Sequence, residues 1–186
     1  YTGTPLDARE FDANGNLVLR RPSSGGAPTA TIAYDYRNQM VEYDDLTTGE
    51  RHTYAYDALG RRIGRVVDAD GAAQVTRYFY DNWRVCEEQD GAGAPLATYV
   101  YGLYIDEVLQ VQRGGSSYFY HGDDLYNIML ITNDAGLPVE RYEYTDYGAP
   151  QVFDGTGAPI ASTAIGNPYM FQGRRRDSET GWYLHR

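Results

Sequence analysis

The chain has 186 residues, with 21 glycines, 19 tyrosines, one cysteine and a formal charge of −10. The acidic balance argues against nucleic acid or an anionic membrane as a partner, because both require a basic face. No apolar run approaches the ~20 residues that span a bilayer, so we expect no membrane insertion. The lone Cys86 rules out an intrachain disulfide and a cysteine-based metal site.

Segments in which apolar and polar residues alternate recur along the chain and predict half-buried strands. In chain order they are 31–36, 52–56, 75–80, 97–101 and 139–144. Glycine-containing turn signals separate them, and Asn-Gly or Asp-Gly between strands is typical of two-residue hairpins. We therefore expect hairpins to turn at Asn14-Gly15, Asp70-Gly71 and Asp90-Gly91. No stretch carries a helical stripe longer than about two turns, so the predicted class is all-β.

An aromatic residue followed by aspartate recurs at a nearly constant interval. Spacings of 23, 22 and 24 residues separate the first four copies, which are Phe11-Asp12, Tyr34-Asp35, Tyr56-Asp57 and Tyr80-Asp81. Looser copies follow at Tyr101-Gly102, Tyr120-His121 and Tyr144-Thr145. A period of 20 to 50 residues indicates one supersecondary unit that buries its apolar face only against neighbouring copies. We expect repeated antiparallel hairpins with tyrosines stacked along one face.

Each repeat has the same internal order, shown by residues 56–62. Tyr56 ends a strand, Asp57 opens a turn and Gly60 closes it. An aspartate can accept hydrogen bonds from backbone N–H groups two residues on, which fixes the turn locally. Asn38 takes the glycine position in an earlier copy, because asparagine also tolerates the left-handed backbone.

The Tyr-Asp-x-x-Gly-Arg pattern at 56–61, followed by an alternating strand, resembles the RHS or YD repeat. Residues 118–136, 141–148 and 167–183 resemble the RHS-associated core. We therefore expect YD-type repeats over 1–117 and a continuous core-like segment over 118–186. The core-like positions expected to be structural are Tyr120, Tyr144, Gly148, Asn167, Pro168, Gly173 and Gly181.

The resemblance implies a β-ribbon that spirals into a hollow shell, barrel or fibre segment. Family members include toxins whose shell encloses a C-terminal effector, and animal teneurins. The main expectation is a non-enzymatic structural protein of a cell-surface or secreted shell or filament. Two alternatives remain open: the shell segment of a polymorphic or insecticidal-type toxin, and a carbohydrate-binding adhesin. The corresponding partners are further copies or repeats of the protein, an enclosed effector, or glycans.

At each position that could bind a metal or act in catalysis, a structural role explains the residues better. Residues 68–71 and 12–16 hold oxygen ligands but complete no EF-hand, and hairpin turns explain them. His121 lies near Asp123 and Asp124 but falls in a predicted turn. The run 174–176 is three arginines followed by acidic residues, which favours a neutralising surface or pairing within the chain over phosphate binding. We assign no catalytic, cofactor or metal residues.

Both ends of a ribbon expose strand edges that can template further pairing. Residues 2–4 and 183–184 contain no lysine, and only Pro5 could blunt the first edge. We therefore expect strand addition between this chain and further repeats or copies.

Overall fold

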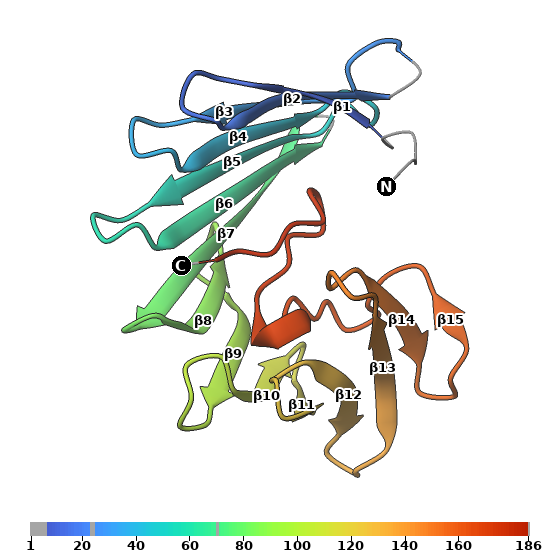
Figure 1. The fold of residues 1–186 in the computed structure, drawn as a ribbon. Helices are drawn as coiled ribbons and strands as arrows, with labels where there is room; N and C mark the ends of the chain where they lie inside the picture. The colour runs from blue at the N-terminus through green and yellow to red at the C-terminus, as the bar shows by residue number, and fades with distance from the viewer. Residues whose placement is uncertain (1–6, 23–24, 70, 186) are drawn as a thin grey trace. The chain divides into compact units, whose positions relative to one another are not determined.

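The computed structural model describes residues 7–22, 25–69 and 71–185, and the chain divides into two compact units, 1–77 and 78–186. Strands follow one another in hydrogen-bonded order from β1 to β15 (Figure 1). The described residues contain no α-helix, only the short 3₁₀ turn η1, so the predicted all-β class is confirmed. The bounds are β1 Asp7–Phe11, β2 Leu17–Pro22, β3 Ala30–Tyr34, β4 Met40–Asp45, β5 Arg51–Tyr56, β6 Arg62–Ala69, β7 Ala72–Asp81, β8 Arg84–Asp90, β9 Pro95–Tyr101, β10 Val108–Arg113, β11 Ser116–Gly122, β12 Ile128–Asn133, β13 Pro138–Tyr144, β14 Pro150–Asp154, β15 Pro159–Ile160 and η1 Phe171–Gly173.

The first unit is built from β1 to β6 and the start of β7. Its strands alternate buried and more exposed residues, as the sequence pattern predicts. Ile32 and Tyr43 are directly opposed on β3 and β4 and are both buried. His52 and Tyr54 continue this buried face on β5.

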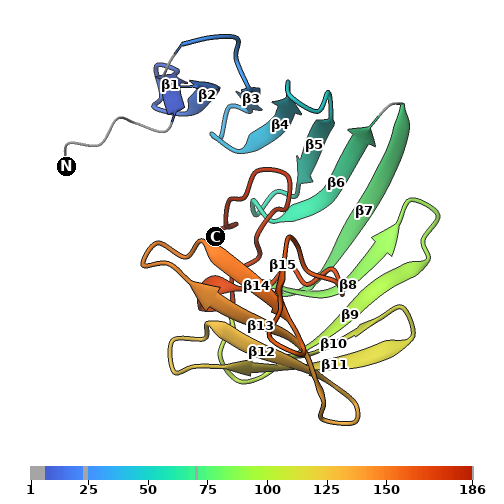
Figure 2. The ribbon, with the colours of Figure 1, turned by 90° about the vertical axis from the view of Figure 1, so that its right-hand side faces the viewer.

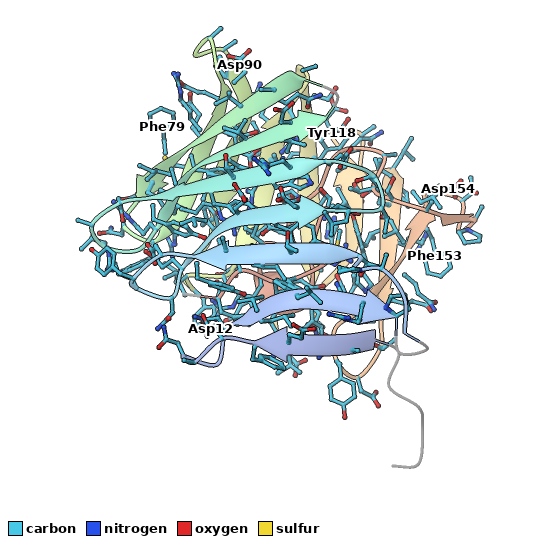
Figure 3. All side chains as sticks on the ribbon, turned by 90° about the horizontal axis from the view of Figure 1, so that it is seen from above. Asp12, Phe79, Asp90, Tyr118, Phe153 and Asp154 are labelled. Carbon is cyan, nitrogen blue, oxygen red and sulfur yellow. The ribbon has the colours of Figure 1, made fainter. Side chains whose placement is uncertain are left out.

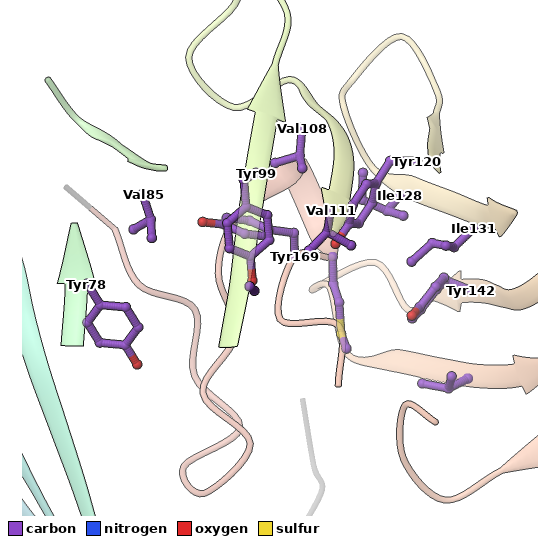
Figure 4. Close-up of a cluster of buried hydrophobic side chains, with 13 residues drawn as sticks. Tyr78, Val85, Tyr99, Val108, Val111, Tyr120, Ile128, Ile131, Tyr142 and Tyr169 are labelled. Atoms are coloured by element: carbon purple, nitrogen blue, oxygen red, sulfur yellow. The ribbon is translucent and has the colours of Figure 1, made fainter. Parts of the chain in front are cut away.

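The second unit has one apolar cluster, which lies between its sheet and the chain that follows β15. Figure 4 shows this cluster, to which Tyr78, Tyr99, Tyr120 and Tyr142 each contribute a ring. After β15 the chain returns across the same face, and η1 lies beside β12 (Figures 1 and 2). Burial of this face therefore depends on residues distant in sequence from the strands.

In most repeats the fully buried residue is a tyrosine two positions before the aromatic-aspartate pair, and the two aromatic residues lie on the same sheet face, because side chains alternate between the faces. Tyr54, for example, is 6% exposed, whereas Tyr56 is half-buried. The buried positions recur every 21 to 24 residues and are Ile32, Tyr54, Tyr78, Tyr99, Tyr120 and Tyr142.

Tyr56, Tyr101 and Tyr144, which are half-buried, each donate a hydrogen bond from the hydroxyl to the backbone sixteen residues earlier. Tyr56 donates to the carbonyl of Met40 at 2.8 Å, which lies at the start of β4. The equivalent bonds are Tyr101 to Val85 at 3.0 Å and Tyr144 to Ile128 at 2.7 Å. Each such bond ties the end of one hairpin to the returning strand of the preceding hairpin.

Most turns have five residues rather than the two that Asn-Gly and Asp-Gly predict. The first N–H donates to the fifth carbonyl, and the fourth residue has positive φ, as in the bulged hairpin turn. Glycine is favoured at the fourth position, so Gly15 closes the first of these turns, and Gly93, rather than Gly91, closes the turn that Asp90 opens. The turns of this form are 12–16, 35–39, 57–61, 90–94, 123–127, 133–137, 145–149 and 154–158.

The side chain that opens such a turn accepts backbone hydrogen bonds from the third and fifth residues. For Asp57 these come from the N–H groups of Leu59 and Arg61, both at 2.9 Å. The same pair of bonds is formed by Asp12, Asp35, Asp90, Asp123, Asn133 and Asp154. Figure 3 labels three of these side chains, Asp12, Asp90 and Asp154, at hairpin ends.

Two copies of the motif differ from the sequence-based alignment. Strand β7 runs on through Asp81, and the next strand starts at Arg84, so Asp81 opens no five-residue turn. Tyr120 lies inside β11, which continues to Gly122, and Asp123 opens the turn. Tyr120-His121 is therefore not the aromatic-aspartate position of its repeat, and Tyr120 belongs with the buried tyrosines instead. The reason is that an aromatic at every second strand position makes two registers look alike in sequence.

Candidate functional site: the anchored C-terminal segment

Residues 161–185, here called the C-terminal segment, lie across the apolar face of the second unit and form almost no regular strand. Two carboxylates from the sheet, Glu88 and Glu140, hold the segment there, together with the amide side chain of Asn167. Each of these three residues is at most 3% exposed. Buried polar groups of this kind are stable only when they are fully paired, so the pairing defines the site.

The first anchor is an ion pair between β8 and the C-terminal segment. Arg175 donates from Nη1 to Oε1 of Glu88 at 2.6 Å, and Arg113 on β10 donates to Oε2 at 3.0 Å. The hydroxyl of Tyr99 donates to Oε1 at 2.9 Å. The guanidinium of Arg175 also lies 4.6 Å from the centre of the Tyr78 ring, which is cation–π distance.

The charges of this anchor are fixed by their mutual contact. Burial opposes ionisation of Glu88, but the guanidinium groups of Arg175 and Arg113 outweigh it and lower the pKa of Glu88 below its ordinary value. Burial also raises the pKa of the Tyr99 hydroxyl, and the Glu88 charge adds to this effect. The carboxylate therefore stays ionised and the phenol stays protonated at neutral pH.

The second anchor is Glu140 on β13, which is fully buried. Its carboxylate accepts hydrogen bonds from the Thr163 hydroxyl at 2.8 and 2.9 Å, from the N–H of Ile165 at 3.0 Å, and from the N–H of Ala164. Tyr142 donates its hydroxyl to the same carboxylate. These donors come mainly from the start of the C-terminal segment, so Glu140 fixes the point where the chain leaves β15.

Asn167 joins the segment to two of the buried tyrosines. Its Oδ1 accepts the hydroxyl of Tyr120 at 2.8 Å and the N–H of Tyr169 at 3.0 Å. Its Nδ2 donates to the Tyr142 hydroxyl at 3.0 Å and to the Tyr169 carbonyl at 2.7 Å. All four of these contacts involve buried atoms, so no other side chain of similar size would satisfy them.

The predicted positions of the core-like segment come together at this site. Pro168 accepts a hydrogen bond from the N–H of Arg176 at 2.8 Å. Gly173 has positive φ and lies against the carbonyl of Asp106, where a Cβ atom would overlap the oxygen. At Gly148 a Cβ would overlap the ring of Phe171. Gly181 also has positive φ and closes a turn that Asp177 opens.

The remaining predicted positions lie at the ends of hairpin strands. Tyr80 packs against the apolar cluster, and Tyr144 does the same from β13, with its ring centre 5.5 Å from that of Phe171 in the C-terminal segment. The first-unit positions Phe11, Tyr34 and Tyr56 end strands β1, β3 and β5, each followed by its turn aspartate. Their roles as structural repeat positions stay a prediction. Of the turn signals, Asp70 lies outside the described residues, as do residues 2–5 of the predicted first edge.

Sequence reasoning did not single out Glu88, Glu140, Arg113 or Thr163. The signal in the sequence was a glutamate at a strand position that faces inward. Glu140, for example, lies two residues before the buried Tyr142 on β13 and therefore on the same face. The expectation that the arginine run pairs within the chain is confirmed, because Arg175 bonds Glu88 and Arg174 lies 3.3 Å from Asp106.

Other candidate chemistry finds no support in the described part of the chain. His121 is hydrogen-bonded to the Thr132 hydroxyl at 2.9 Å, while Asp123 is occupied by its turn. Within residues 7–22, 25–69 and 71–185, no three histidine, cysteine or acidic side chains gather as metal ligands. No helix among these residues has the length and apolarity to cross a membrane.

Comparison with known families gives the same assignment as the repeat pattern. The Teneurin YD-shell family profile matches residues 7–155. The chain belongs to this family. The predicted membership of the RHS/YD-repeat family is thereby confirmed, and Rhs-named proteins of Dickeya dadantii are among its relatives, at 27% identity over 95% of the chain.

Two further relatives are bacterial proteins of much greater length. The chain is 32% identical to tRNA nuclease WapA of Bacillus subtilis over 93% of its own length and 7% of that protein. It is 29% identical to toxin protein Tse5 of Pseudomonas aeruginosa over 95% of the chain and 15% of that protein. The chain thus spans only a small part of each.

Among solved structures, the TcdB2-TccC3 complex without its hypervariable C-terminal region superposes with a TM-score of 0.61. The match covers 95% of this chain and 11% of that one at 14% identity. Agreement at this identity shows a shared fold.

Proposed function

We propose that the chain is a wall segment of a toxin shell that encloses a C-terminal effector, and that it carries out no chemistry itself. The observation that carries the proposal is the C-terminal segment, which Glu140 and Glu88 hold against one face of the second unit's sheet. A domain that follows the segment would be delivered to that face. The carboxylates of Glu88 and Glu140 are occupied by donors from the protein itself, which suits holding a chain rather than binding a substrate.

The relatives favour this toxin shell over the surface filament that the sequence also allows. Tse5 is named as a toxin, and WapA and a Burkholderia cenocepacia protein are named as a tRNA nuclease and a double-stranded DNA deaminase toxin. Under the proposal, those activities belong to effector domains outside the region matched here. A shell of this kind acts outside the producing cell, so the proposed location is secreted or cell-surface.

The test is protection of the downstream domain in the full-length protein. The full-length chain is treated with a protease that digests the downstream domain when this domain is expressed alone. We expect the domain to resist digestion within the full-length protein and to become sensitive when the shell is unfolded with denaturant. Equal digestion rates for the free and the attached domain would overturn the proposal.

A further inference from the structure

The sheet of the second unit has a second face, which points away from the apolar cluster. Side chains alternate along a strand, so the residues that flank the buried members of the cluster (Figure 4) point to this side, here called the outer face. Several of these residues are large and apolar. They are Val100 and Phe119, with 53% and 37% of their surface exposed, and the half-buried Leu130 and Phe153.

The strand register places these residues in two rows that meet. Successive partners across β9, β10, β11 and β12 are Val100, Gln110, Phe119 and Thr132. Successive partners across β11, β12, β13 and β14 are His121, Leu130, Arg141 and Phe153. The rows meet on β11, where Phe119 and His121 are two residues apart. The two rows, with Glu143 two residues beyond Arg141 on β13, are here called the outer patch.

The face of the first unit that lies opposite its buried residues, taken by itself, is charged. There Asp44, Arg51 and Asp68 are successive partners across β4, β5 and β6, and Arg51 Nε lies 2.7 Å from Asp44. Glu10 and Arg21 form a further ion pair on that face. Paired charges suit contact with water, whereas a contiguous apolar patch marks an interaction site. The same repeat architecture thus carries a solvent-facing surface in one unit and a surface suited to a partner in the other.

Two opposite and unpaired charges lie in the outer patch. Arg141 and Glu143 are both exposed, and their side chains leave the same face of β13 about 7 Å apart. Within the described part of the chain, neither side chain forms an ion pair or a hydrogen bond. The two charges cancel each other, although the chain as a whole has a formal charge of −10. A partner for this patch must therefore offer one acidic and one basic group at a similar spacing.

We propose that the outer patch packs face to face on the outer patch of a second copy of the protein, about a two-fold axis. In a two-fold contact each residue meets the other's counterpart reciprocally, so Arg141 of each copy faces Glu143 of the other. Both unpaired charges are then neutralised, and the second copy brings the required spacing by symmetry. The apolar residues of the two rows pack between the sheets, which stack about 10 Å apart.

The size of the patch sets the strength of the pairing. Six strands at a spacing of about 4.8 Å make a patch about 24 Å wide, which belongs to the smaller class of protein interfaces. We therefore expect a weak dimer that forms and dissociates with concentration. The outer face lies opposite the face that the C-terminal segment covers, so this inference does not depend on the proposed function, and either can fail alone.

Sedimentation velocity of the full-length protein over a concentration series tests the pairing. The parent protein should shift from monomer to dimer as its concentration rises. Arg141→Glu and Glu143→Arg should each weaken the dimer at least tenfold, because like charges then face each other. Arg77→Glu is the control, since Arg77 is exposed on β7 in the first unit and should leave the dimer unchanged. A parent that stays monomeric at every concentration would leave the patch to a different partner and overturn the proposal.

Mixing the two charge variants tests the reciprocal contact itself. One variant carries two acidic side chains at these positions and the other two basic ones, so an equimolar mixture of Arg141→Glu and Glu143→Arg should dimerise although neither does so alone. A mixture that stays monomeric would contradict the proposal, and so would a parent dimer that both variants leave intact. Urea unfolding at monomer concentrations checks the fold, and both variants should keep the parent midpoint, because neither side chain has a contact in its own chain.

Discussion

Arg175 Nη1 lies 2.6 Å from Oε1 of Glu88, although 87 residues separate the two in the chain. Both side chains are almost completely buried, at 9% and 4% exposure. The pair thus couples a strand from the middle of the chain to a segment near residue 185. It is one of three contacts, with those of Glu140 and Asn167, that hold the C-terminal segment on the sheet.

Removing one partner of this pair should be strongly destabilising. Arg175→Met leaves Glu88 buried with half of its charge compensation, and breaking a buried ion pair costs about 3–5 kcal/mol. Urea unfolding measures the loss in free energy. Arg141→Met is the control, since Arg141 is exposed on β13 and surface changes stay within about 0.5 kcal/mol. A loss from Arg175→Met no larger than that of the control would contradict the anchoring role.

Replacing both partners should recover much of the stability. In Glu88→Leu/Arg175→Met no buried charge of the pair is left unpaired, and apolar replacements of buried pairs are often neutral or stabilising. We expect the double variant to unfold at a higher urea concentration than Arg175→Met alone. If the double variant unfolds at a lower urea concentration than Arg175→Met, Glu88 has an independent role through Arg113 and Tyr99.

Acid should weaken the fold partly through Glu88. Because its folded pKa lies below the ordinary value of 4.5, its contribution is complete above pH 4.5 and is lost as the pH falls from there through the folded pKa. Glu88→Gln should therefore show a smaller fall in urea midpoint than the parent protein between pH 7 and pH 3. Turn carboxylates such as Asp12 and Asp57 also have lowered pKa values, so the difference between the two proteins is the measure. If the urea midpoints of the two proteins fall by the same amount between pH 7 and pH 3, Glu88 does not contribute to the acid sensitivity.

The hydroxyl bonds of the half-buried tyrosines can be tested one atom at a time. Tyr144→Phe removes the 2.7 Å bond to the carbonyl of Ile128 and keeps the ring. The expected loss is about 1 kcal/mol in the free energy of unfolding. Tyr147→Phe is the control, because Tyr147 is 88% exposed. Equal stability of the two variants would show that the bond to the preceding hairpin contributes nothing.

The turn-opening side chains can be tested at Asn133. Asn133→Ala removes the acceptor of the Ala135 and Leu137 N–H groups, each bonded at 3.0 Å. Thermal unfolding should show a loss of about 1 kcal/mol. Asn133→Asp keeps an acceptor oxygen in the same place, as in the other repeats, and should retain the stability. If both substitutions cost the same, the hydrogen bonds are not the cause.

The glycine of η1 should be required for seating the C-terminal segment. Gly173→Ala combines positive φ with an overlap on the carbonyl of Asp106, whereas Gly136→Ala has positive φ but open space. The left-handed backbone alone costs an alanine about 1–2 kcal/mol relative to glycine. Hydrogen exchange should therefore accelerate at the amides of Met170 and Arg174 in Gly173→Ala and stay unchanged there in Gly136→Ala. Unchanged exchange in both variants would mean that the segment tolerates the added methyl group.

The sequence by itself determined the hairpin architecture, because its signals are local. A strand's alternation, and an aspartate that bonds the N–H groups two and four residues on, are decided within five or six residues, as in the turn 57–61. The strand ends at Phe11, Tyr34 and Tyr56 follow from this order. Turn length was less predictable, since Asp90-Gly91 reads as a two-residue turn until Gly93 is seen to take the left-handed position.

Only the tertiary structure decided which tyrosines are buried and what the core-like glycines do. Tyr120 and Tyr144 both stand in alternating strands, and their different burial follows from the register of β11 and β13. Gly173 is required by the Asp106 carbonyl, 67 residues away in sequence. The contact between Glu88 and Arg175 produces no periodic pattern in the sequence. A buried charge needs a partner that is close in space, and this partner can lie at any distance along the chain.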